Sequence, residues 1–152
     1  MKRVVQFMSF TALLMAVFCM PKAIAQKTDA DAILGTWVTG TGKGHVQIYK
    51  QDNKYYGKIV WLQEPNDDQG KPKTDKNNPD DKLKSRPIMG LVNLRNFEYG
   101  GGNEWEDGQV YDPQKGKDYS CQMTLVNPNT LEVRGYIGIS LIGRTDTWKR
   151  VK

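Results

Sequence analysis

The sequence predicts an all-β fold, a small antiparallel up-and-down β-barrel of eight or nine strands. Short segments in which apolar and polar residues alternate recur from Ile33 to Val151, and Gly, Pro, Asn and Asp gather in the short links between them. Almost no part of this region shows the apolar period of a helix. A β-sandwich would fit the same spacing, but sequential hairpins suit a closed barrel, and closure removes exposed sheet edges.

The clearest single unit is a hairpin at residues 108–125. Every second residue from Tyr119 to Leu125 is apolar, which is the period of a strand with one buried face. Residues 112–116 supply the reversal, because proline is preset for an early turn position and glycine for a left-handed one. We therefore expect two antiparallel strands joined by this turn.

The chain before this hairpin is divided by turns into short runs. A meander of three strands comes first, with reversals at 40–44 and 51–54 that are rich in Gly, Asn and Asp. Three consecutive glycines then predict a turn at 98–103. The strands expected in this part are residues 33–38, 45–50, 55–62 and 88–97, and residues 104–106 lead from the glycine turn toward the hairpin.

Residues 63–86 break the strand pattern and read as a long loop. Asp, Asn, Lys and Pro dominate it, and loops of this length in a compact domain are usually functional or disordered. Its carboxylates are of the type that binds a hard cation, but lysines interleave with them and their spacing is irregular. A solvated loop is the favoured interpretation, so the sequence predicts no metal site here.

Two strands follow the hairpin, at residues 130–137 and 141–151. One face of the last strand carries Ile142, Arg144, Asp146, Trp148 and Arg150. If this face points inward, charged side chains lie inside the barrel, where charges are usually paired or bound to a ligand. If it points outward, Thr145 and Thr147 face the interior instead, and the sequence leaves both alternatives open.

The first 25 residues have the form of a secretory signal peptide. A basic start precedes an apolar run at residues 4–20, and small residues predict cleavage between Ala25 and Gln26. No second apolar run follows, so we expect no transmembrane segment after cleavage. Phe18 argues against lipidation of Cys19, because the residue before a lipidated cysteine is normally small.

The rest of the chain predicts a flexible lead-in at 26–32 and a single barrel domain at 33–152, located in the periplasm or secreted. Signal cleavage removes three basic residues and no acid, so the formal charge falls from +5 to +2, which gives little reason to expect a nucleic-acid partner. Cys121 then has no disulfide partner in the chain. Its position on an apolar face favours a buried side chain over a reactive thiol.

The first and last predicted strands carry residues that resemble a pattern of lipocalin-like barrels. In those barrels the first strand contains Gly-x-Trp, and an Arg on the last strand packs across this Trp. The matching residues are Gly35-Thr36-Trp37 and Arg150. More specific motifs are Asn78-Pro79-Asp80, Arg86-Pro87-Ile88-Met89-Gly90, Trp105-x-x-Gly108, Tyr111-Asp112-Pro113, Gly116-Lys117-x-Tyr119-x-Cys121, Leu131-x-Val133-Arg134-Gly135-Tyr136 and Gly143-Arg144-Thr145-x-Thr147-Trp148-x-Arg150. In this order, behind a signal peptide, they resemble the bacterial exported proteins grouped as DUF2147. The resemblance implies a lipocalin-like barrel outside the cytoplasm and no established activity.

No catalytic constellation stands out, and the sequence predicts no catalytic residues and no cofactor. His45 is the only histidine, which leaves one candidate base for a nucleophilic triad and excludes a His-rich metal site. Glu104, Glu106 and Asp107 could supply paired carboxylates for acid–base chemistry on a sugar, but adjacent acids on a turn are more typical of a solvated loop.

We therefore expect a non-enzymatic binding module that holds a small apolar or amphipathic ligand, with Arg144 placed to meet an anionic head group. The expected ligand-binding residues are Trp61, Trp105, Tyr111, Tyr136, Arg144 and Trp148, and the expected structural residues are Gly35, Trp37, Asp112, Pro113 and Arg150. The aromatic side chains could equally fill a barrel of this size. One alternative is an envelope interaction or structural protein whose partner contacts residues 63–86; a carboxylate-based enzyme ranks third.

Overall fold

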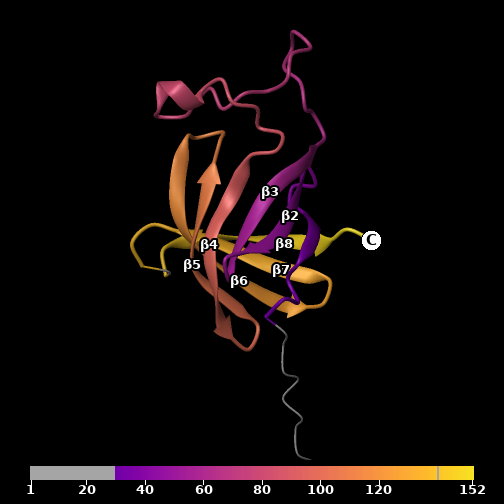
Figure 1. The fold of residues 1–152 in the computed structure, drawn as a ribbon, viewed down its shortest axis with the longest axis vertical. Coiled ribbons are helices and arrows are strands. Elements are labelled where there is room, and N and C mark those ends of the chain that lie inside the picture. The colour runs from indigo at the N-terminus through magenta and orange to yellow at the C-terminus, as the bar shows by residue number, and fades with distance from the viewer. Residues whose placement is uncertain (1–29, 140) are drawn as a thin grey trace, which may run out of the picture.

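The computed structural model describes residues 30–139 and 141–152. The predicted signal peptide, its cleavage site and the first part of the lead-in lie outside the described residues. Within them, eight antiparallel strands follow one another around a closed barrel, and β1 completes the circle by pairing with β8 (Figure 1). The predicted up-and-down barrel is confirmed, and the sandwich alternative is excluded.

The strands are β1 (Gly35–Val38), β2 (Gly44–Gln51), β3 (Lys54–Leu62), β4 (Val92–Gly101), β5 (Glu104–Asp112), β6 (Lys117–Asn127), β7 (Thr130–Tyr136) and β8 (Gly143–Arg150). The connection between β3 and β4, residues 63–91, is the long loop, and it contains a short 3-10 helix, η1 (Asp81–Leu83). The long loop lies at the top of Figure 1, and the β4–β5 turn lies at the bottom. No helix in the part of the chain described here has the length and apolar character needed to cross a membrane.

The prediction that residues 98–103 form the turn is wrong. Strand β4 continues to Gly101, because Glu98 and Tyr99 pair with residues of β5 across the sheet. The reversal needs only Gly102 and Asn103, and Gly102 has a φ of 60°, a conformation that glycine adopts without strain. The same strand begins at Val92 rather than at residue 88.

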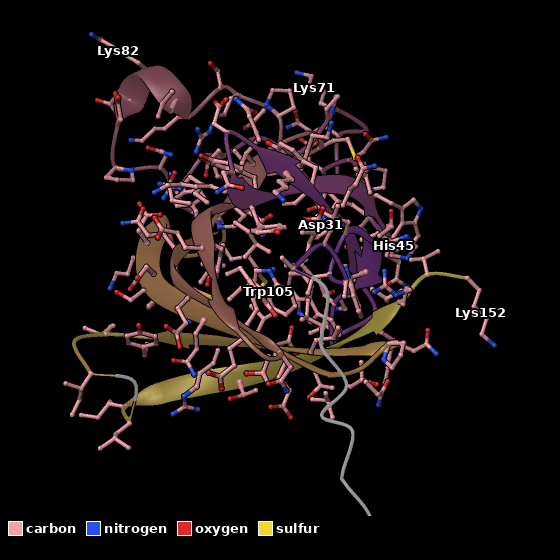
Figure 2. All side chains as sticks on the ribbon, turned by 60° about the horizontal axis from the view of Figure 1, so that its bottom comes forward. Asp31, His45, Lys71, Lys82, Trp105 and Lys152 are labelled. Atoms are coloured by element: carbon pink, nitrogen blue, oxygen red, sulfur yellow. The ribbon has the colours of Figure 1, made fainter. Side chains whose placement is uncertain are left out.

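Aromatic side chains fill the bottom half of the barrel. Trp37, Tyr55, Phe97 and Trp105 have almost no exposed surface, and Trp105 lies in the middle of the barrel in Figure 2. Residues 30–33 close this end, because Trp105 Nε1 donates to the carbonyl of Ala30 at 3.1 Å and Trp37 Nε1 to that of Ile33 at 2.9 Å. These rings therefore occupy the lower half of the barrel, and residues 30–33 cover them.

Arg150 ties the two ends of the chain together. Its guanidinium lies over the Trp37 ring, 4.2 Å from the ring centre, and donates to the carbonyls of Ala32, Leu34 and Pro128, each at 2.7 Å. Gly35 permits this approach, because a Cβ atom at that position would lie 2.9 Å from Arg150 Nη1.

Of the two alternatives for the last strand, the face with Trp148 points inward. Trp148 is 4% exposed, whereas Thr145 and Thr147 are exposed to solvent. The Asp146 carboxylate on the same face accepts hydrogen bonds from Trp148 Nε1 at 2.7 Å and from the Gly40 amide at 3.2 Å. The acid is therefore satisfied by the protein itself.

The predicted hairpin packs as expected along β6. Cys121, Met123 and Leu125 are buried, and Tyr119 near the start of the strand is half-buried. Burial raises the pKa of the Cys121 thiol to about 12. Because the thiolate is the reactive form, Cys121 serves as a small apolar core residue.

Candidate functional site

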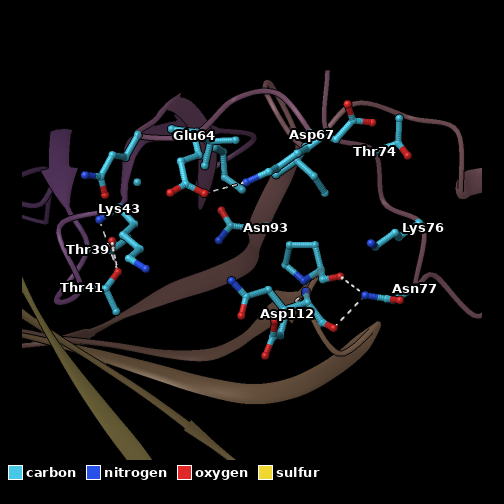
Figure 3. Close-up of a pocket in the computed structure, with 18 of the residues that line it drawn as sticks. Thr39, Thr41, Lys43, Glu64, Asp67, Thr74, Lys76, Asn77, Asn93 and Asp112 are labelled. Atoms are coloured by element: carbon cyan, nitrogen blue, oxygen red, sulfur yellow. Dashed lines mark hydrogen bonds and ion pairs between the residues drawn. The ribbon is translucent and has the colours of Figure 1, made fainter. Parts of the chain in front are cut away.

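The top of the barrel is hollow. A pocket of about 580 Å³ lies between the β1–β2 turn, the long loop at residues 63–91 and the β5–β6 turn (Figure 3). Pockets that bind small molecules in proteins are commonly about 300 to 1,000 Å³ in volume. The barrel thus combines a filled lower half with an upper half large enough for a small ligand.

The pocket has an apolar floor and a polar rim. Its apolar surface comes from the inner faces of β2 and β3 and from the end of the long loop, at Val46, Ile59, Leu62 and Ile88. Hydroxyl, amide and charged side chains surround the opening, among them Thr39, Thr41, Lys43, Glu64, Asp67, Lys73, Lys76 and Asn77. Such a surface matches a molecule with one apolar and one polar end.

Asn93 is the buried polar side chain at the centre of this site. Between the pairs Lys58↔Val92 and Gly57↔Leu94, β4 has one residue more than β3, and this β-bulge leaves Asn93 without a partner across the sheet. Its side chain lines the pocket and is 9% exposed, and Figure 3 shows it between Glu64 and Asp112. Among the described residues, nothing donates a hydrogen bond to Asn93 Oδ1.

The charged groups of the rim differ in how far they are paired. Lys73 forms an ion pair with Glu64 at 3.2 Å, and Asp67 Oδ1 accepts the backbone amides of Gln69 and Lys71 at 2.9 Å each. Lys43 and Lys76 form no ion pair with any residue that the structure describes, and Figure 3 shows the Lys76 ammonium pointing toward the pocket. Two ammonium groups are thus available to the polar end of a ligand.

A buried carboxylate anchors the long loop to the barrel. Asp75 is fully buried, and its two oxygens accept hydrogen bonds from Tyr111 on β5 at 2.7 Å, from Asn78 at 2.8 Å and from Arg86 Nε at 2.9 Å. The Arg86 guanidinium also forms an ion pair with the same carboxylate at 2.8 Å. This cluster holds the loop that forms one wall of the pocket.

A second contact joins the loop to the β5–β6 turn. Asn77 Nδ2 donates to the carbonyl of Gln114 at 2.8 Å and, more weakly, to that of Pro113 at 3.4 Å. Gly116 lies so close to the loop that a Cβ atom there would be 1.8 Å from the Asn77 carbonyl oxygen. The pocket walls at the loop and at this turn therefore support each other.

The anchor is expected to weaken in acid. Burial by itself raises the pKa of the Asp75 carboxyl, but the hydrogen bonds from Asn78, Tyr111 and Arg86 outweigh it and hold the pKa below its usual value. A carboxyl with a lowered pKa in the folded state stabilises the fold above its pKa in the unfolded state, about 3.9, and this contribution is lost as the pH falls through the folded-state value.

We therefore predict that the stability of the loop is constant near neutral pH and falls only below about pH 4. Hydrogen exchange of residues 63–91, measured between pH 7 and pH 3 and corrected for intrinsic exchange, would show the loss. The same measurement on Asp75→Asn is the control, since this variant has no such carboxyl to titrate. An equal acid response in both proteins would contradict the role of Asp75.

The predicted ligand-binding residues are not part of the pocket lining. Trp105, Tyr111 and Trp148 are buried in the protein, whereas Trp61 is 41% exposed and Arg144 is exposed. Trp61 packs against His45, with ring centres 4.4 Å apart and ring planes tilted by 32°. Tyr136 is half-buried at the end of β7. None of the six lines the pocket; of the predicted structural residues, Asp112 and Pro113 do.

The carboxylates considered for acid–base chemistry on a sugar do not line the pocket. Glu104, Glu106 and Asp107 are exposed on β5, while Trp105 between them turns into the core. Among the described residues there is also no group of three or more His, Cys, Asp or Glu placed to hold a metal ion.

The chain matches, over residues 35–150, the family model described as "Uncharacterized protein conserved in bacteria (DUF2147)". The chain belongs to the DUF2147 family. This confirms the resemblance that its motifs indicate across the barrel. A comparison of the DUF2147 chain with curated proteins found no match.

A solved structure shares the fold of this DUF2147 protein. Protein HP1028 from the human pathogen Helicobacter pylori, described as belonging to the lipocalin family, is similar with a TM-score of 0.68 and 25% sequence identity. The match covers 78% of this chain and 82% of that chain. The fold is therefore lipocalin-like, as the Gly-x-Trp motif and Arg150 indicate.

Proposed function

We propose that this DUF2147 protein is a binding module that holds one small amphipathic molecule in the pocket at the top of the barrel. The observation that carries the proposal is the buried side chain of Asn93, whose oxygen has no partner among the described residues although it lines a pocket. Leaving a buried polar group unpaired costs about 1 to 3 kcal/mol. A ligand with an N–H or O–H group would remove this cost by donating a hydrogen bond to Asn93 Oδ1. Rotation of the Asn93 side-chain amide can turn this oxygen toward the ligand.

The rest of the pocket defines the two ends of the ligand. Its apolar end would lie on Val46, Ile59 and Ile88, and its polar end would meet the hydroxyl and ammonium groups of the rim. Lys43 and Lys76 take the role that the sequence suggested for Arg144, namely contact with an anionic head group. Lipocalin barrels commonly hold one small ligand, so the lipocalin-like fold supports this proposal.

The proposed place of action is the periplasm or the cell exterior, on the basis of the signal peptide predicted at residues 1–25. The alternative function, an envelope interaction protein that uses residues 63–86, stays a prediction. No described contact favours it over ligand binding, because the anchored part of this loop builds a wall of the pocket.

Native mass spectrometry of the protein purified from its own cell envelope tests the proposal. We expect a discrete extra mass that disappears after organic extraction, and we expect the extracted protein to bind the amphipathic anion 8-anilino-1-naphthalenesulfonate with a rise in its fluorescence. A bare polypeptide mass together with no fluorescence rise would contradict the proposal.

A further inference from the structure

Four large aliphatic side chains are exposed together where β7 turns into β8. Ile137, Ile139, Leu141 and Ile142, named here the apolar tip, have exposed fractions of 70%, 60%, 84% and 70%. The sequence pattern places Ile137 on the buried face of its strand, but β7 ends at Tyr136 and the residue lies beyond the barrel. Exposed aliphatic residues gathered in this way commonly mark an interaction site.

The apolar tip is part of a defined turn that stands away from the barrel. The Ile137 amide donates to the carbonyl of Ile142 at 3.4 Å, and the Ile142 amide donates to that of Ile139 at 3.1 Å. In Figures 1 and 2 this connection protrudes from the body of the molecule at the left. The four exposed side chains therefore lie on a protruding turn.

The charges next to the apolar tip are basic. Arg134 and Arg144 flank it, and the sequence contains no Asp or Glu between them. Arg134 donates to the hydroxyl of Thr145 at 3.0 Å and to the carbonyl of Leu141 at 3.4 Å, which holds its guanidinium beside the turn. On the neighbouring strand β6, Asp118 is paired with Arg95, so its charge is largely neutralised.

We propose that the apolar tip inserts into the surface of a membrane that contains anionic lipids. Four highly exposed aliphatic side chains on one protruding turn can enter the apolar layer of a membrane together. Basic residues beside an apolar anchor strengthen binding to anionic head groups. A second copy of this chain fits less well, because the flanking guanidinium groups of two tips would repel each other.

Membrane binding would also orient the ligand pocket. In a barrel of this topology the β1–β2, β3–β4, β5–β6 and β7–β8 connections all lie at the same end, and the first three of them surround the pocket. The apolar tip is the fourth of these connections, and Figure 1 shows it at the left, apart from the long loop at the top. The observations that support membrane binding by the apolar tip do not depend on the pocket. The tip can therefore bind lipid whether or not the pocket holds a ligand.

Flotation with lipid vesicles tests the inference on the protein as its host processes it, with its N-terminus established by mass spectrometry. We expect it to bind vesicles of phosphatidylcholine with 30% phosphatidylglycerol, and we expect the double variant I139N/L141N to lose at least tenfold in binding. Arg144→Gln should bind these anionic vesicles severalfold more weakly than the native chain does, and it should bind vesicles of pure phosphatidylcholine as the native chain does. Because these side chains are exposed, the variants should unfold at the same temperature as the native chain.

The matched control is Val126→Asn, which alters an exposed aliphatic residue near the β6–β7 turn at the opposite end of the barrel. It should bind vesicles like the native chain. Absence of vesicle binding by the native chain, or equal binding by I139N/L141N, would overturn the inference. A native dimer that I139N/L141N converts to monomer, without vesicle binding by either, would overturn it in favour of a second copy as the occupant.

Discussion

Replacing Asp75 with alanine is expected to weaken the attachment of the long loop to the barrel by about 3 kcal/mol. The substitution removes the acceptor of hydrogen bonds from Tyr111, Asn78 and Arg86. Asn78 Nδ2 still donates to the Tyr111 hydroxyl at 2.9 Å, but the Tyr111 hydroxyl proton and the Arg86 guanidinium lose the acceptor that Asp75 supplies. Hydrogen exchange should show it as roughly hundredfold faster exchange of the Asn78 and Ile88 amides, whose acceptors are carbonyls within the loop.

Asp68→Ala is the control for this result. Asp68 belongs to the same loop and carries the same charge, but it is exposed and forms no ion pair with a described residue. We expect its exchange rates to stay within a factor of two or three of the native values, since surface substitutions usually change stability by less than about 0.5 kcal/mol. If Asp75→Ala and Asp68→Ala exchange alike, the buried cluster does not anchor the loop.

The barrel could be predicted because its determinants are local. Alternation along β6, turn residues at 112–116 and the regular spacing of reversals each act over a few residues, and closure follows from their sequential order. The errors in β4 also have local causes. Consecutive glycines usually mark a turn, but Gly100 and Gly101 lie within the strand, because cross-strand pairing outweighs their low strand propensity.

The site was harder to predict because it depends on contacts between distant residues. Asp75 and Tyr111 are 36 positions apart, and only the folded loop makes the carboxylate a buried anchor rather than a solvated charge. The aromatic residues expected to line a pocket have other places: Trp105 helps to fill the lower half of the barrel, Tyr111 bonds the buried Asp75, and Trp61 is exposed. One signal was present: Asn93 interrupts the apolar run Leu91-Val92-Asn93-Leu94 at the start of a strand.

The variant Asn93→Leu is expected to separate binding from stability. Leucine has nearly the shape of asparagine and no polar atoms, so the variant removes the unpaired buried oxygen without leaving a cavity. We expect the extracted protein to gain about 1 kcal/mol in free energy of unfolding, which urea denaturation would measure as a higher midpoint. Binding of the molecule that copurifies with the protein should fall at least tenfold.

Asn129→Leu is the matched control, because Asn129 is exposed in the β6–β7 turn at the far end of the barrel. It should change the free energy of unfolding by less than about 0.5 kcal/mol and leave binding unchanged. A large loss of stability in Asn93→Leu with unchanged binding would mean that the amide is a structural group, and it would remove the main support for the ligand site.

The opposite signs of the two expected changes are what make this experiment decisive. A residue that serves only the fold is selected for stability, so its replacement lowers stability and affects binding only through misfolding. A residue kept for binding can be unfavourable in the empty protein, and replacing it then raises stability while binding is lost. The β-bulge that leaves Asn93 unpaired and the pocket that it lines favour the second case.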